Sequence, residues 1–301
     1  MPSDAPSRLR PAMALRIAFG VVTLACVSWL SWHGYLYVAE SRTIAALEKE
    51  GALFDVNDAG SPQGAVQDFA RGWRYVTMTV EATPVDLRLA CKLRGLHTLH
   101  FQDTALREED VQAFSKMSQL QRISMMQARA PRSTWRQIAH LRNLTWLLLK
   151  DVDVGDDGVE ELTALRQLRW LDLSHCGVTD KGLTSLGALA DLDQLELARS
   201  GISAVGLRQL ATLPRLTRLD LSKCGLADAA LESLVGCKSL WQLDLSGNPI
   251  TDASLKTLCR MKNLMAVRLR GTNVSDTRLE SFIRTDGHCT IVHNPSATES
   301  N

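Results

Sequence analysis

The sequence predicts an α/β solenoid built from 24-residue strand–helix units, preceded by one membrane-spanning helix. Leucines recur at a fixed interval of 24 residues over most of the chain. Within each interval, apolar residues first alternate at the spacing of a strand and then recur at the spacing of a helix. An uncharged, largely apolar segment of 23 residues lies near the N-terminus. These three observations set the fold class.

Each unit begins at a leucine, here called the anchor. The anchors are Leu96, Leu120, Leu144, Leu168, Leu192, Leu216, Leu240 and Leu264. Residues three and five after each anchor are apolar with mostly polar neighbours, which predicts a short strand. Residues fifteen and eighteen after it lie one helical turn apart, which predicts a short helix. One such pair cannot enclose a core, so neighbouring units are expected to stack with parallel strands.

The predicted helices begin at recurring polar residues. A Ser or Thr followed by Asp stands at Thr179, Thr251 and Ser275, where a hydroxyl and a carboxylate can accept from the first free amides of a helix. The unit over residues 121–144 lacks this pattern and has Pro131 there. We therefore expect its outer side to be irregular.

These motifs resemble the leucine-rich repeats. The stretch LDLSHCGVTDKGL from Leu171 is nearly repeated as LDLSKCGLADAAL from Leu219 and as LDLSGNPITDASL from Leu243. The similarity is to the ribonuclease-inhibitor-like, cysteine-containing and GALA-type subclasses, and it covers residues 93–284. It implies a horseshoe-shaped solenoid with a parallel sheet on its concave face, a surface on which such proteins generally bind other proteins.

The residue eight positions after the anchor departs from those subclasses. This column contains Thr104, Ala128, Val152, Cys176, Ser200, Cys224, Asn248 and Thr272. A continuous ladder of Asn or Cys is absent from it. We therefore expect the hydrogen bonding of the backbone in this turn to vary from unit to unit.

The chain divides into five predicted segments. Residues 1–16 form a cytoplasmic N-terminal segment, and residues 17–39 form the transmembrane helix. Residues 40–95 form an N-terminal cap with a degenerate first repeat. Residues 96–293 form the leucine-rich-repeat domain, and residues 294–301 a disordered tail.

The apolar segment over residues 17–39 is long enough to cross a bilayer, which takes roughly 20 residues. Arg8, Arg10 and Arg16 precede it and Glu40 follows it. Basic residues favour the cytoplasmic side, so we expect a single-pass protein of the cytoplasmic membrane with its N-terminus inside and its repeats outside. The alternative is a cleaved signal peptide or a lipidated Cys26.

Charge and motifs argue against several other functions. The 34 basic and 33 acidic residues nearly cancel, which is atypical of a nucleic-acid-binding protein. The groups of His and Cys around Cys91 and Cys289 lack the paired spacing of structural zinc sites. Cys176, beside His175, falls in a turn column that favours a structural role. The sequence predicts no enzyme, no metal and no cofactor.

The candidate binding site lies on the predicted concave face, where residues two, four and six after each anchor point outward. Its members are Trp146, Leu148, Trp170, Asp172, Glu196, Arg218, Asp220 and Asp244. Four of them are acids in consecutive units, and like charges about 5 Å apart repel by about 0.8 kcal/mol even in water. We expect Arg199, Arg218 and Lys223 to offset part of this repulsion.

Each half of this site also has a structural explanation. The acids belong to a short sequence motif that is common in such repeats, and the tryptophans could pack against the N-terminal cap. As a site, the surface would bind a protein or peptide with basic and apolar groups. The predicted function is a membrane-anchored protein-binding module. The alternatives are a self-associating envelope scaffold and a substrate-receptor subunit of a ubiquitin ligase.

Overall fold

The computed structural model describes residues 42–49, 52–56, 76–81, 87–93, 96–279 and 290–292. The chain divides into two compact units, Met1–Ala46 and Leu47–Asn301. Among the described residues, no helix is long and apolar enough to cross a membrane. The predicted transmembrane segment, residues 17–39, and the predicted tail, residues 294–301, lie outside the described residues.

The second unit contains a single sheet whose strands follow one another in sequence order. Its strands are β1 (Ala52–Val56), β2 (Val76–Glu81), β3 (Leu96–Gln102), β4 (Arg122–Met126), β5 (Trp146–Lys150), β6 (Trp170–Asp172), β7 (Gln194–Glu196), β8 (Arg218–Asp220), β9 (Gln242–Asp244), β10 (Ala266–Arg268) and β11 (Thr290–Val292). All neighbouring pairs from β2 to β11 are parallel. The sheet therefore has the predicted solenoid arrangement.

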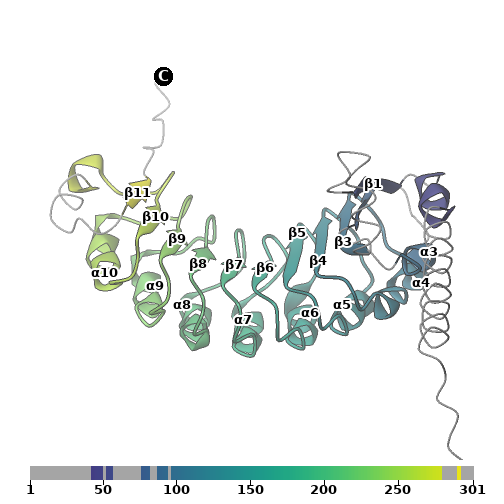
Figure 1. Cartoon of the computed structure of the whole chain (residues 1–301). Helices are drawn as coiled ribbons and strands as arrows, with labels where there is room; N and C mark the ends of the chain where they lie inside the picture. Colours follow the sequence, from purple (N-terminus) through teal and green to yellow (C-terminus); the bar gives the residue numbers. More distant parts are fainter. Residues whose placement is uncertain are drawn as a thin grey trace, which may run out of the picture. The chain divides into compact units, whose positions relative to one another are not determined.

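Short helices follow the strands and lie along the outer side of the curved sheet, while the strands line the inner side (Figure 1). The α-helices are α3 (Leu87–Ala90), α4 (Glu108–Val111), α5 (Ser133–Ile138), α6 (Gly155–Leu162), α7 (Asp180–Leu186), α8 (Ala204–Leu207), α9 (Asp228–Leu231) and α10 (Leu255–Arg260). The 3-10 helices are η1 (Phe114–Lys116), η2 (Arg208–Thr212), η3 (Glu232–Leu234) and η4 (Asp252–Ser254).

The 24-residue interval sets the register of the sheet. Leu171 pairs with Leu195, and Leu195 with Leu219, so equivalent leucines stack directly on one another. All three are at most 3% exposed. Burying one such side chain fully contributes about 1.5–3 kcal/mol, and each layer is closed only by its neighbours.

The turn after each strand from β3 to β10 holds one residue in the left-handed region. His175, Arg199 and Lys223 have φ of 55°, 58° and 57°, and Gly247 occupies the equivalent place at 69°. A side chain costs roughly 1 kcal/mol there, and glycine avoids that cost. The stacking of the units therefore overrides the local preference of these residues.

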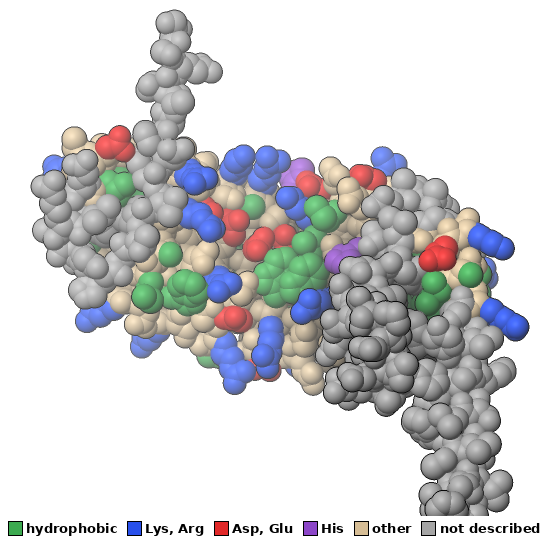
Figure 2. Space-filling model, turned by 45° about the horizontal axis from the view of Figure 1, so that its top comes forward, with side chains coloured by type: hydrophobic (Ala, Val, Ile, Leu, Met, Phe, Trp, Pro, Cys, Tyr) green, Lys and Arg blue, Asp and Glu red, His purple; other side chains and the backbone are tan. Residues whose placement is uncertain are grey.

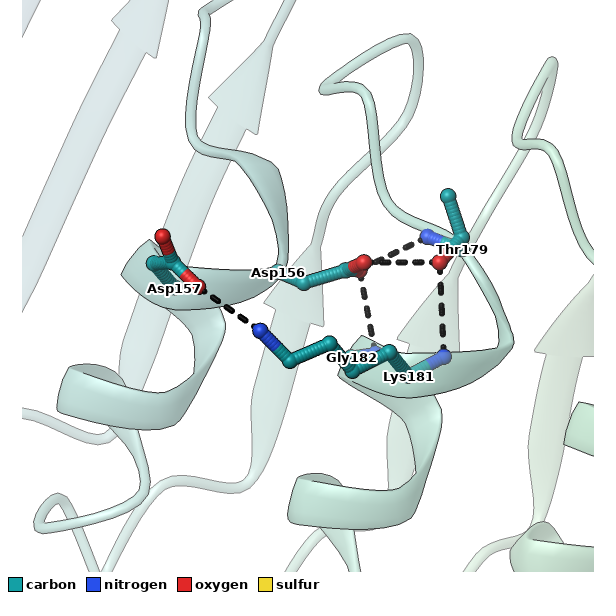
Figure 3. Close-up of polar contacts among 5 residues, drawn as sticks. All are labelled: Asp156, Asp157, Thr179, Lys181 and Gly182. Carbon is teal, nitrogen blue, oxygen red and sulfur yellow. Dashed lines mark hydrogen bonds and ion pairs between the residues drawn. The ribbon is translucent and has the colours of Figure 1, made fainter.

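Carboxylates on the outer side connect neighbouring helices. Asp156, in the first turn of α6, accepts from the Thr179 amide at 2.9 Å, from its hydroxyl at 2.7 Å and from the Gly182 amide at 3.0 Å (Figure 3). Asp180 accepts in the same way from Ser203 of the following unit. The hydroxyl of Thr179 caps its own helix as predicted, accepting from Lys181 at 3.3 Å. The Asp that follows such a hydroxyl residue instead bonds across to the next unit.

This ladder is interrupted once between α6 and Ser275, the part over which the described residues allow it to be followed. Asp228 contacts Thr251, and Asp252 contacts Ser275. The unit of α8 has Ala204 in the acceptor position, and Ala227, the residue that would donate a hydroxyl to it, lacks one too. Acceptor and donor are therefore missing together, which indicates that they act as a pair.

The ladder predicts that Asp156→Ala lowers the free energy of unfolding by about 1 kcal/mol, since three hydrogen bonds between units are lost from a partly solvated place. Asp157→Ala is the matched control. It removes only an exposed ion pair to Lys181, at 2.9 Å, and should leave stability unchanged. Urea unfolding followed by circular dichroism measures both. Equal losses in the two variants would contradict the ladder.

Two features differ from the sequence predictions. The unit over residues 121–144 has a regular six-residue helix, α5, so the expected irregularity is wrong. Its first turn forms without a side-chain cap, since the packing of neighbouring helices suffices to hold it. At the other end of the sheet, β1 pairs with β2 in the antiparallel direction, which the repeat pattern did not predict.

Candidate functional site on the concave face

The concave face has a pair of stacked tryptophans near its middle. Trp146 on β5 pairs with Trp170 on β6, and their ring centroids are 4.4 Å apart with an angle of 6° between the planes. Both side chains are only partly buried, as is that of Leu148, the strand neighbour of Trp146. The sequence placed the two tryptophans in the same column of adjacent units, and the structure brings their rings into contact. These three residues are called the apolar patch below.

A row of acids continues from the apolar patch along the sheet. In register, Asp172 pairs with Glu196, Glu196 with Asp220, and Asp220 with Asp244. These four residues are called the acidic row. Figure 2, which views the molecule from the side of the strands, shows hydrophobic side chains gathered near the middle with acidic side chains beside them.

Three members of the acidic row are held by their own turns. The carboxylates of Asp172 and Asp220 each accept from the amide of the serine two residues later, at 2.7 Å. Asp244 makes the same contact at 2.9 Å. Two positions after Glu196 the chain has Ala198 in place of serine, and the Glu196 side chain is one methylene longer than that of an aspartate. The three aspartates therefore have a structural role in their turns, as the repeat motif suggested. Glu196 is the one member of the acidic row without such a contact to its own turn.

The acidic row is a place of unfavourable charge. Burial raises the pKa of Glu196 to about 7, helped by the neighbouring carboxylates of Asp172 and Asp220, and Lys150 acts in the opposite direction. Burial also raises the pKa of Asp220, although its bonds to Ser222 lower it. Asp172 is only 3% exposed. The acidic row therefore places carboxyl groups where partial burial disfavours their ionised form.

The basic residues expected to offset this charge are arranged differently. Arg218 lies over the ring of Trp241, with its guanidinium carbon 5.0 Å from the ring centroid. Asp244 has an ion pair with Arg268 at 3.5 Å, and Lys150 acts on Glu196. The role predicted for Arg218 beside the acids is thus replaced by a cation–π contact with Trp241.

Trp241, Lys150 and Arg268 were missed as site residues. Trp241 stands one position after its anchor, outside the columns that were expected to face outward. Lys150 and Arg268 do fall in outward columns, six and four positions after their anchors, so the column rule alone could have found them.

Cys176 has the structural role that its column predicted. It is 1% exposed, its thiol contacts the Leu149 carbonyl, and burial raises its pKa to about 12. His175 beside it contacts Asp151 and lies outside the core. A thiol in this state is a poor nucleophile.

Comparison with known proteins agrees with this geometry. Family models described as leucine-rich repeats match residues 190–250 and 165–187. The solved structure of internalin C2 from Listeria monocytogenes is similar, with a TM-score of 0.53 and 22% identity over 70% of this chain and 86% of that one. A leucine-rich-repeat protein of Leptospira interrogans gives a TM-score of 0.48 and 18% identity over 68% and 56% of the two chains. A search of curated proteins found no match. Residues 165–187 and 190–250 thus match leucine-rich repeats, and the stacked leucine columns give the described part of the chain the fold of such repeats.

Proposed function

We propose that the protein is a membrane-anchored binding module that takes a protein or peptide partner on its concave face. The anchor would be residues 17–39, with the repeats outside the cytoplasmic membrane. Leucine-rich repeats serve protein–protein interaction in general. The apolar patch supports the location, because two stacked tryptophans and a leucine remain partly exposed in the middle of a sheet face.

The acidic row supports a partner of complementary charge. A basic and apolar segment would cover the tryptophans and neutralise carboxylates that are half-buried and close together. The observation that carries the proposal is the adjacency of the two groups, since Trp170 and Asp172 belong to the same three-residue strand.

Partner capture with site-directed crosslinking tests this function. A photo-crosslinking residue replaces Leu148 in one variant and the exposed Lys256, on the outer side of the solenoid, in the control. We expect a specific adduct from the first position only. Adding Trp170→Ala and Asp220→Lys to the first variant should reduce the adduct at least tenfold, because both the apolar contact and the charge are lost. An unchanged adduct, in a protein whose circular dichroism is native, would contradict the proposal.

The proposed topology has its own test. Protease added to intact spheroplasts should digest the repeats if they lie outside the cytoplasmic membrane. Protection of the repeats, with digestion only after lysis, would reverse the proposed orientation.

A further inference from the structure

Within the acidic row, Asp172, Glu196 and Asp220 lie on three successive strands beside the apolar patch. We propose that the partner group seated there is an arginine side chain, and that its docking releases a proton held among these three carboxyl groups in the free protein. This inference rests on the proposed function, because it concerns the same face and names the chemistry of its partner.

The three carboxyl groups are close because the strands are in register. Paired residues of β6, β7 and β8 lie about 4.8 Å from one strand to the next. The charged groups that act on Glu196 are Asp172 from β6, Asp220 from β8 and Lys150 from β5. Two carboxylates and one cation leave the site with excess negative charge. A bound proton relieves that excess in the free protein, and a docked cation can replace the proton.

The apolar patch favours a flat cation. The rings of Trp146 and Trp170 face each other across adjacent strands, and Trp170 is paired on β7 with Gln194, two residues before Glu196. A guanidinium group is planar, stacks on indole rings and donates two parallel hydrogen bonds to a carboxylate. An ammonium group is compact and more strongly hydrated.

The chain already contains one such contact on this part of the solenoid. Arg218 of β8 lies over the Trp241 ring at 5.0 Å, so an arginine–tryptophan pair is compatible with the spacing of the units. Trp170 stands in the same column as Arg218, two units earlier, with Glu196 one strand away. A partner arginine over Trp170 would make the same kind of arginine–tryptophan contact from outside the chain, with the Glu196 carboxylate one strand away.

The release of a proton follows from the protonation state of Glu196 in the free protein. With its pKa raised to about 7 by burial and by its acidic neighbours, Glu196 carries a proton for much of the time at neutral pH. A guanidinium group favours the ionised form. Binding should therefore strengthen as the pH rises from about 5.5 to 8, by about tenfold in affinity, with about half a proton released at pH 7 and close to one near pH 6.

The test uses small probes on the full chain in detergent micelles. N-acetylarginine amide is titrated against N-acetylcitrulline amide, which has nearly the same shape without the charge, and binding is followed by tryptophan fluorescence. We expect at least tenfold tighter binding of the arginine probe at pH 8, and weaker binding of N-acetyllysine amide. Calorimetry in buffers of different ionisation enthalpy should report the released proton. Glu196→Gln should remove most of the proton release and of the pH dependence, leaving only the smaller part due to Asp220, and Glu109→Gln, on the exposed start of α4, should keep both in full.

Several outcomes would overturn the inference. These are no binding of the arginine probe up to its solubility, equal binding of the citrulline or lysine probe, and binding by the wild-type chain without proton release. Each would leave the proposed function standing if the crosslink at position 148 still depends on Trp170. A crosslink that is independent of Trp170 would instead remove the proposed function, whatever the probes do.

Discussion

Replacing Asn248 by alanine should lower the free energy of unfolding by about 3–4 kcal/mol, a large effect for a single polar residue. Asn248 is 2% exposed and makes four hydrogen bonds to the backbone. Its carbonyl accepts from the Cys224 and Leu226 amides at 3.0 Å each. Its amide group donates to the Leu221 and Leu245 carbonyls at 2.8 and 2.9 Å. Alanine would leave these groups buried without partners.

The same column provides a graded control. The Cys224 thiol, one unit earlier, donates to the Leu197 carbonyl at 3.1 Å, and a thiol replaces only part of what an amide can do. Asn248→Cys should therefore fall between the wild type and Asn248→Ala in urea unfolding. Hydrogen exchange at the Cys224 and Leu226 amides should accelerate in both variants. Unfolding curves that coincide with the wild type would show that these backbone groups find other partners.

This column illustrates how far the sequence predicts the fold. The variation from unit to unit was expected from the residue types, and it is confirmed. Asn248 makes four bonds and the hydroxyl of Thr272 one, to the Leu269 carbonyl, while the buried Ser200 hydroxyl has no hydrogen-bond partner in the described structure. The leucine columns were predictable because each layer must bury them in the same way. The antiparallel β1 was not, since it stands outside the repeat and carries no periodic pattern.

The candidate site was predictable in position and less so in detail. The spacing of 24 residues places Trp146 beside Trp170 whatever their rotamers are, and the rings do stack. The spacing also places Arg218 one strand from Glu196, but a long flexible side chain has several partners within reach. It contacts Trp241, a neighbour that the column rule did not mark as exposed. The sequence therefore predicts which residues lie on the exposed side of the sheet, but not which neighbour a long side chain such as that of Arg218 contacts.

Glu196→Gln should raise the free energy of unfolding by about 2 kcal/mol at pH 8 and by only about 0.5 kcal/mol at pH 5. In the folded protein the Glu196 pKa is about 7, well above its ordinary value of 4.5. Between these two values the folded state holds a proton that the unfolded chain has released. The stability associated with that proton is present in full below about pH 4.5 and is lost as the pH rises through 7.

The size of this change in stability depends on how strongly solvent screens the Glu196 carboxylate. A shift from 4.5 to about 7 corresponds to roughly 3 kcal/mol in a fully buried group, and screening at this half-exposed position reduces it to about 2. Glutamine has the shape of protonated glutamate and can still donate to Asp172, so the variant retains the neutral form at every pH. Asp220, whose pKa is also raised, should leave a smaller slope of the same sign in the variant.

Urea unfolding of the wild type, Glu196→Gln and the control Glu109→Gln at pH 5, 6.5 and 8 measures this dependence. The wild type should lose stability relative to Glu196→Gln as the pH rises, and Glu109→Gln should follow the wild type. A constant difference between wild type and Glu196→Gln at the three pH values would mean that Glu196 is ionised throughout. In that case the free protein has no proton to release when a cation docks, so this measurement also tests the basis of the arginine inference without any partner present.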